Sequence, residues 1–412
     1  MKKVAVNALT KSVAAIIAAL IAISAATVGV LLLYGGFQGT SETIKIGVLT
    51  PLSAPADFTS GKLILSVAEI FRDYVNEKGG IKSRRVELVV EDQTLDPAKA
   101  VASLQRMVTE KRIVGLIGPW ESLIALPVAR ATNDYPTIMF VTYSWADAIT
   151  ADKPKYVFRV GVYNSLFAAH LLDYVKWRGY KHVAVLTEQS PYGLGFRDAM
   201  ISLARERLPE LQISSVEAPQ DKVDFSAELL KIKDLKPQLL VVAFNLPAIA
   251  QINKQFYELG LDKQMEIIQG HDWPAWDGGK TWWETLGEKG VGGRYPTYYS
   301  PNMKISPACE DFRRLYKEKT GAEPVHWIFW YWDSLRILQK AIEDTGSTDP
   351  NVLASYIEKI DMEGCTGRIR FVNDPTPGSP MWHQWMEMTQ FVMEFTELNQ
   401  PVEKTKQIYP PP

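Results

Sequence analysis

Seven polar or aromatic residues stand shortly after short apolar segments of the chain, where a parallel sheet would place a ligand. Short segments rich in β-branched residues and bounded by turn residues predict buried strands. The carboxyl ends of parallel strands meet at one edge of a sheet, so the residues that follow them gather there. The candidates are Ser122, Tyr143, Ser144 and Trp145 in the first half of the chain and Tyr192, Asn245 and Asp272 in the second.

Two of these candidates indicate which charged groups a ligand would carry. Ser122 follows a Gly-Pro turn and begins a predicted helix, where a hydroxyl group and free main-chain N–H groups suit a carboxylate. Asp272 at a strand end suits an ammonium group. Each residue alone also fits an ordinary role, Ser122 as a helix cap and Asp272 as a solvated turn residue. A binding site is therefore predicted from the combination and not from either residue alone.

Catalytic motifs are missing from the sequence. No GxGxxG follows the first predicted strand, and neither a GxxxxGK[ST] phosphate loop nor a GxSxG nucleophile elbow occurs. A Ser-His-Asp triad can occur in any chain order, so the sequence leaves that arrangement open. The histidines lack metal-ligand spacing; they are His170, His182, His271, His326 and His383. We expect no enzymatic activity, no cofactor and no metal.

Charge and cysteine content narrow the class of partner. The chain has 45 basic and 47 acidic side chains, which is too even a balance for a nucleic-acid-binding face. Cys309 and Cys365 are the only cysteines. Outside the cell they are free to form a disulfide, and two buried thiols are the alternative.

The first 40 residues predict a hydrophobic helix that is not part of the folded domains. Lys2, Lys3 and Lys11 precede an uncharged run, and residues 13–33 are long enough to cross a bilayer. The lysines predict that the rest of the chain lies outside the cytoplasm. The segment is either a signal peptide cleaved near Ala26 or an uncleaved membrane anchor, and the apolar run beyond that point favours the anchor.

Predicted strands and helices alternate along the remainder of the chain. Strands at residues 44–49, 86–91, 113–117 and 137–141 are separated by helical patterns, and a second such array begins with a helix at residues 164–178. Two tandem arrays of this kind predict two α/β lobes, each with a parallel sheet. Near the end, residues 382–396 predict a hairpin.

Several segments together resemble the periplasmic binding proteins of branched-chain amino-acid ABC transporters, the leucine/isoleucine/valine-binding protein family with the type I periplasmic binding protein fold. The segments are IKIGVLTPLSAP, YVNEKGGIKSRRVELVVEDQTLDPAKA, GLIGPWES, TEQSPYGLGF, DFSAELLKIK and a closing strand near residues 407–410. The resemblance implies two doubly wound parallel-sheet lobes joined by a three-crossover hinge. It places lobe 1 at residues 43–163 and 294–372, lobe 2 at residues 164–293 and 373–400, and an extended tail at residues 401–412.

The same resemblance implies roles for the candidate residues. Ser122 would bind a ligand carboxylate, and the loop with Tyr143, Ser144 and Trp145 would add main-chain groups and a hydroxyl. Tyr192 would pack on the ligand. Asp272 would bind the α-amino group, or His271 if the alignment shifts by one residue. Asn245 stands where the family often has Tyr.

Departures from the family pattern lie next to the expected site. Trp145 stands where a Thr is usual, and Trp120 and Glu121 precede Ser122 where small or neutral residues are common. Larger and more polar side chains would reshape the pocket, so a leucine-like ligand does not follow from the resemblance. The 12 tryptophans either form an aromatic cage or, as most tryptophans do, fill the core and the lobe interface.

The function implied by the resemblance is that of an extracytoplasmic solute-binding protein of an ABC importer. It would capture an amino acid or a related small carboxylate or amide and deliver it to a membrane permease, held near the membrane by residues 1–40. The alternative is a membrane-anchored sensor built on the same two lobes, with an enzyme on this fold as a third reading.

Overall fold

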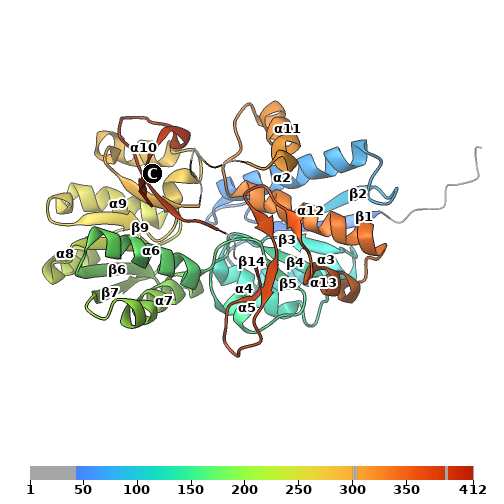
Figure 1. Ribbon diagram of the computed structural model, residues 1–412, viewed down its shortest axis with the longest axis horizontal. Coiled ribbons are helices and arrows are strands. Elements are labelled where there is room, and N and C mark those ends of the chain that lie inside the picture. The colour runs from blue at the N-terminus through green and yellow to red at the C-terminus, as the bar shows by residue number, and fades with distance from the viewer. Residues whose placement is uncertain (1–42, 299, 301–302, 304, 386–387, 412) are drawn as a thin grey trace, which may run out of the picture.

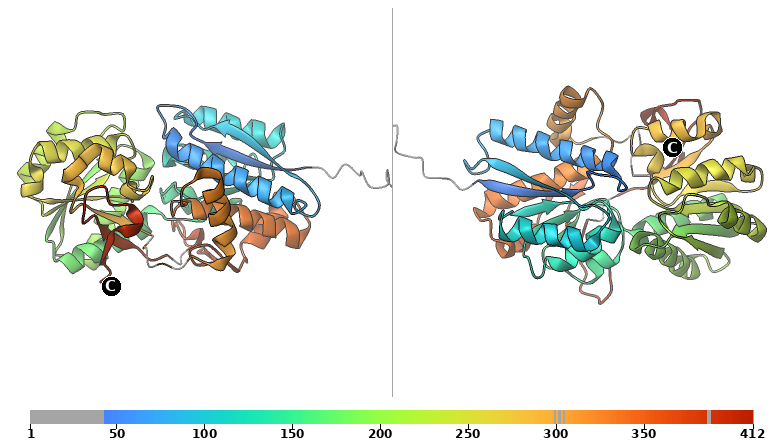
Figure 2. Two further views of the ribbon diagram at one scale, coloured as in Figure 1. Left: turned by 90° about the horizontal axis from the view of Figure 1, so that it is seen from above. Right: turned by 180° about the vertical axis from the view of Figure 1, so that it is seen from behind.

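A computed structural model describes residues 43–411, except residues 299, 301–302, 304 and 386–387 (Figure 1). The predicted N-terminal helix, residues 1–40, lies outside the described residues. Within the described part of the chain, every helix is too short or too polar to cross a lipid bilayer. The described residues form two α/β lobes that lie side by side in all three views (Figures 1 and 2).

The first lobe is built on a sheet of seven described strands in the order β13-β14-β5-β4-β3-β1-β2. Strands β1 to β5 run parallel to one another, and β13 is antiparallel to β14. The strands are β1 (Ile44–Thr50), β2 (Val86–Asp92), β3 (Gly115–Ile117), β4 (Ile138–Val141), β5 (Val157–Arg159), β13 (Phe371–Asn373) and β14 (Trp382–Trp385). The central strands are apolar because both faces of the sheet are covered by helices.

Alternate residues of these strands enter two separate cores. Ile46 and Val48 pack on the side of α2 and α12, whereas Leu49 packs on the side of α3 and α4. This two-residue period follows from strand geometry. The helices are α2 (Phe58–Glu77), α3 (Pro97–Thr109), α4 (Ser122–Ala131), α5 (Ala148–Ala151), α11 (Glu310–Thr320), α12 (Ile328–Thr345) and α13 (Pro350–Ile357).

The second lobe holds a parallel sheet in the order β7-β6-β8-β9 and a smaller antiparallel sheet in the order β10-β15-β16. Its strands are β6 (His182–Glu188), β7 (Gln212–Ala218), β8 (Leu239–Ala243), β9 (Glu266–Gln269), β10 (Arg294–Thr297), β15 (Phe391–Glu394) and β16 (Lys406–Tyr409). Its helices are α6 (Asn164–Arg178), α7 (Pro191–Arg207), α8 (Ser226–Leu235), α9 (Ala248–Glu258) and α10 (Lys280–Leu286). Both lobes therefore have the predicted α/β construction.

The strand pairing moves two of the predicted lobe boundaries. Strand β10 pairs with β15, so the chain leaves the second lobe after Thr297 and not before Arg294. Strand β14 pairs with β5, so the chain returns to the second lobe only after Trp385 (Figure 1). The hairpin predicted at residues 382–396 is wrong for the same reason, because β14 and β15 belong to different sheets. Local residue patterns predict a strand but do not specify the sheet edge at which it pairs.

The C-terminal segment contains a strand of the small antiparallel sheet. Residues 401–412 were expected to be an extended tail, with a closing strand near residues 407–410 implied by the resemblance. Lys406–Tyr409 forms that strand, β16, which pairs with β15 across Glu394 and Lys406. The strand completes the small antiparallel sheet beside α10, where the described chain ends (Figure 1).

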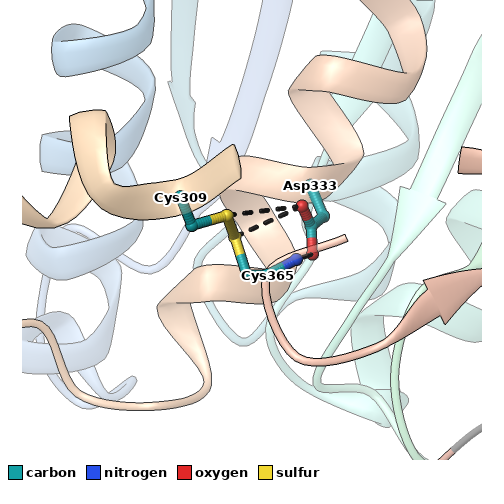
Figure 3. Close-up of side chains that lie close together, drawn as sticks. All are labelled: Cys309, Asp333 and Cys365. Carbon is teal, nitrogen blue, oxygen red and sulfur yellow. Dashed lines mark hydrogen bonds between the residues drawn. A yellow bond between two sulfur atoms is a disulfide. The ribbon is translucent and has the colours of Figure 1, made fainter. Parts of the chain in front are cut away.

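Cys309 and Cys365 form a disulfide in the first lobe, with their Cα atoms 5.2 Å apart (Figure 3). The sequence left open either a disulfide or two buried thiols, and the structure has the disulfide. Both sulfurs lie beside the buried carboxylate of Asp333, which accepts a hydrogen bond of 2.7 Å from the Cys365 main-chain N–H. Among the described residues, these three side chains alone are grouped closely enough to hold a metal ion, but the sulfurs are bonded to each other.

Candidate functional site

Loops at the carboxyl ends of β3 and β4 in the first lobe face loops after β6, β8 and β9 in the second. Together they enclose a chamber of about 10 Å³, which has room for about one water molecule. The chamber is lined by Trp120, Glu121, Ser122, Tyr143, Trp145, Tyr192, Asn245, His271 and Trp276. Five of the seven predicted site residues thus line one chamber, and the remaining two, Ser144 and Asp272, lie behind its wall.

The loop after β3 is shaped by Gly118. Its φ of +94° lies in the left-handed region, and a Cβ atom there would come within 2.0 Å of the Leu49 carbonyl oxygen. The next turn is fixed by Gln93, whose side-chain oxygen accepts a hydrogen bond of 2.8 Å from the Trp120 main-chain N–H. These two contacts place Trp120 and Glu121 at the chamber.

The two predicted serines hold the first lobe together locally. The Ser144 hydroxyl lies 2.9 Å from the Pro119 carbonyl oxygen and 2.8 Å from that of Trp120, and it donates to them. Ser122 Oγ accepts a hydrogen bond of 3.1 Å from the main-chain N–H of Ala146. Ser122 is also the first residue of α4 and not its cap, because the cap position belongs to Glu121. Both hydroxyls join the loops after β3 and β4.

Aromatic rings make up most of the chamber wall. Trp120 stacks on Tyr143 with ring centroids 4.4 Å apart and planes inclined by 3°. Trp276 of the second lobe stands edge-on to both rings, with centroids 5.5 Å and 5.8 Å away. Trp145 meets Tyr192 edge-on at 6.1 Å. At least three of the tryptophans therefore form a cage at the lobe interface.

Tyr192 is held in place by its own hydrogen bonds. It lies in the first turn of α7, where the Ser190 hydroxyl caps the helix by accepting from the Gly193 N–H at 3.2 Å. The Tyr192 hydroxyl donates to the Gly270 carbonyl oxygen at 3.0 Å. With the hydroxyl used in this way, Tyr192 contributes its aromatic ring to the chamber wall.

Asp272 is buried behind the chamber and already has partners. Its Oδ1 accepts a hydrogen bond of 2.9 Å from Trp276 Nε1, and its Oδ2 lies 2.5 Å from His326 Nε2. His326 precedes α12 in the first lobe, so this contact joins the two lobes. Trp276 Nε1 also lies 2.7 Å from the Tyr143 hydroxyl oxygen, which adds a second contact across the cleft.

His271 lines the chamber but its nitrogens face the protein. Nε2 lies 2.6 Å from the Phe244 carbonyl oxygen, and Nδ1 accepts from the Trp273 main-chain N–H at 3.0 Å. Burial lowers the pKa of His271 to about 3, so the ring is neutral. It stacks on Trp276 with centroids 4.4 Å apart and extends the aromatic wall.

Two buried glutamates were missed as site residues. Glu188 ends β6, and its Oε1 accepts from Ser190 Oγ at 2.5 Å and from Asn245 Nδ2 at 3.0 Å. Its Oε2 accepts from the Asn245 main-chain N–H at 2.8 Å. Burial raises its pKa to about 7. An acidic residue at the carboxyl end of an apolar strand was the available sequence signal. The two hydrogen bonds to Glu188 also hold Asn245 in its position.

Glu121 is the second of these glutamates, with only 6% of its surface exposed. Burial, followed by the negative charges of Glu188 and Asp57, raises its pKa to about 8. Its Oε2 has no hydrogen-bond partner among the described residues. The sequence had marked Glu121 only as a departure from the family pattern.

A second cavity of about 420 Å³ adjoins Glu121 and lies between the lobes. This volume falls in the range of small-molecule sites. Its apolar wall comes from Pro55, Leu95, Leu123, Val223, Leu246, Pro247 and Ala248. Glu121 borders both this outer cavity and the inner chamber.

Two parallel-sheet lobes that meet over a site at the carboxyl ends of both sheets define a two-lobed binding protein. The chain belongs to the periplasmic binding protein family, whose model matches residues 43–387. Its fold is the type I fold of the binding proteins of branched-chain amino-acid ABC transporters. The expected family and fold class are thereby confirmed.

Relatives and solved structures agree with this assignment. The chain is similar to Leu/Ile/Val-binding protein homolog 3 of Brucella melitensis, with 26% identity over 310 residues, 74% of this chain and 80% of the relative. A leucine-binding protein from Thermotoga maritima has a TM-score of 0.74 at 23% identity, covering 89% of this chain and 98% of that one. A solute-binding protein from R. palustris in complex with 4-hydroxybenzoate has a TM-score of 0.72 at 18% identity, covering 89% and 96%.

Proposed function

We propose that this protein is an extracytoplasmic solute-binding component of an ABC importer. It captures an amino acid or a related small carboxylate or amide between its lobes and delivers it to a membrane permease, without catalysis. The observation that carries the proposal is the interlobe site itself, bordered by residues from both sheets. Relatives named for leucine, isoleucine and valine support a ligand of this class. Residues 1–40 remain a predicted signal peptide or anchor.

Contacts across the cleft supply the physical link between ligand and closure. Trp276 reaches the Tyr143 hydroxyl, and Asp272 reaches His326, from the opposite lobe. Trp327 Nε1 donates to the Trp276 carbonyl oxygen at 3.3 Å. These contacts exist only when the lobes are together, so a ligand that bridges the lobes favours the closed form and makes it the species that a permease recognises.

A thermal-shift screen of the full-length chain in detergent tests the proposal. The panel contains the amino acids, small carboxylates and small amides. A ligand present at several hundred times its dissociation constant should stabilise the folded protein by about 3–4 kcal/mol. If every compound leaves the melting temperature unchanged, the proposed ligand class is wrong.

A further inference from the structure

We propose that Glu121 binds the positive charge of the ligand, so that the cleft selects a small primary ammonium compound by its ammonium group and does not require a ligand carboxylate. This inference rests on the proposed function, since it needs a ligand between the lobes. It moves the ammonium site from Asp272 in the second lobe to the loop after β3 in the first lobe.

Glu121 lies where the aromatic chamber and the outer cavity meet. Its side chain is almost fully buried, yet it borders both the aromatic chamber and the outer cavity. The Oε2 atom has no partner among the described residues, although buried carboxylate oxygens are normally hydrogen-bonded. A ligand ammonium group in either cavity would supply the missing donors and the compensating charge.

The expected ammonium partner is already occupied. Asp272 uses one oxygen for Trp276 Nε1 and places the other 2.5 Å from His326 Nε2, and it does not border the chamber. Of the two serines expected to bind a carboxylate, Ser144 donates its hydroxyl proton to carbonyl oxygens, whereas Ser122 Oγ accepts from the Ala146 N–H and keeps its own proton for a ligand oxygen.

The charged residues around the two cavities also favour a cationic ligand over an anionic one. The described residues that line the chamber include no Lys or Arg, and the outer cavity has Lys222, whose Nζ lies 2.5 Å from Glu228. Lys222 is therefore already paired, and the described residues that line the two cavities include no other Lys or Arg. The unpartnered indole N–H of Trp145 is an uncharged donor that can receive a ligand oxygen when one is present.

The chamber wall also favours a cation. The faces of Trp, Tyr and Phe rings carry negative electrostatic potential and attract ammonium groups. Trp120, Tyr143 and Trp276 line the chamber, although Trp120 and Tyr143 stack on each other and Trp276 stacks on His271, and Glu121 follows Trp120 directly. Aromatic rings beside a buried carboxylate combine the two ordinary ways in which proteins recognise an organic cation.

Closure of the lobes raises the need for a cation. It brings Glu188 of the second lobe close enough that its negative charge, together with that of Asp57, disfavours ionisation of Glu121. Glu188 is held by Ser190 and Asn245 and cannot turn away without losing three hydrogen bonds. The other titratable groups facing the chamber are Tyr143, Tyr192 and neutral His271. A bound ammonium group offsets this effect and stabilises the ionised form of Glu121, so it favours the closed form.

Three matched ligands separate the charge requirement from ligand shape. L-Leucine, 3-methylbutylamine and 4-methylpentanoate share an aliphatic body. L-Leucine carries both charged groups, 3-methylbutylamine carries only the ammonium group, and 4-methylpentanoate carries only the carboxylate. A second set is L-phenylalanine, 2-phenylethylamine and 3-phenylpropionate. Binding is measured by isothermal titration calorimetry on the full-length chain at pH 7.5.

We expect at least one amine to bind within about tenfold of its amino acid, and its matched acid to bind at least 100-fold more weakly. If an acid binds as well as the amine, or if only the complete amino acid binds, the proposed function stands and the role of Glu121 is overturned. If neither set nor the wider amino-acid, carboxylate and amide panel binds, the proposed ligand class fails and this inference fails with it.

Two variants of Glu121 test the residue directly. Glu121→Gln keeps the shape and removes the charge, and it should weaken amine binding at least 50-fold. Glu121→Asp keeps the charge on a shorter side chain and should retain part of the affinity. Glu77→Gln, at an exposed position of α2, is the matched control and should bind like the unmodified protein. Unchanged amine affinity in a folded Glu121→Gln variant would overturn the assignment.

Discussion

Replacing Glu121 with glutamine should remove a large part of the pH dependence of stability of the ligand-free protein. Burial and the charges of Glu188 and Asp57 raise the pKa of Glu121 from its ordinary value of 4.5 to about 8. Between these two values the folded protein keeps a proton that the unfolded chain has released. The free energy of unfolding therefore falls as pH rises from 4.5, and it levels off above about 8.

The size of this effect follows from the width of the pH range. At about 1.4 kcal/mol per pH unit, Glu121 removes about 4–5 kcal/mol of stability between pH 4.5 and pH 8. Glu188, whose pKa is raised to about 7, adds a loss in the same direction over the lower part of the range. Glu121→Gln should match the unmodified protein near pH 4.5 and be more stable by about 4 kcal/mol at pH 8.

Lobe opening offers the protein a second way to avoid this cost, because separated lobes expose Glu121 to water. The assay therefore combines urea unfolding with small-angle X-ray scattering at each pH from 4.5 to 8.5. The unmodified protein should lose stability, or increase its radius of gyration, as pH rises, and Glu121→Gln should do neither to the same extent. Glu77→Gln is the control. Identical pH profiles for Glu121→Gln and the unmodified protein, by both measurements, would show that the pKa of Glu121 is not raised by burial in the closed form.

Two further predictions concern other contacts. Changing both Cys309 and Cys365 to serine should destabilise the protein by about 4 kcal/mol in urea unfolding, because the bond closes a loop with a sequence separation of 56 residues. A reducing agent should then have no effect on the double variant, and an unchanged midpoint would contradict the prediction. His326→Ala removes the partner of one oxygen of buried Asp272 and should cost about 1–3 kcal/mol, measured in the same way. Adding Asp272→Asn should recover part of that loss, and simple additivity of the two changes would contradict a direct interlobe pair.

The sequence by itself determined the two-lobed α/β fold and the region of the site. Apolar segments that are buried on both faces of a parallel sheet have a distinctive composition, so strands such as Ile44–Thr50 and Ile138–Val141 were predictable. The residues that follow parallel strands meet at one edge, and this rule brought Ser122, Tyr143, Trp145, Tyr192 and Asn245 to one chamber.

Only the tertiary structure decided the sheet to which the late strands belong and the charges of the site. Strand β10 pairs with β15 about 100 residues away, and β14 pairs with its near neighbour β13 and with β5 about 225 residues away. Nothing in the residues of β10 or β14 specifies these distant partners. The burial of Glu121, its repulsion by Glu188 and the pairing of Asp272 with His326 all depend on the meeting of two lobes. Desolvation and charge interactions act through space, so a sequence can name these residues without revealing that they face one another.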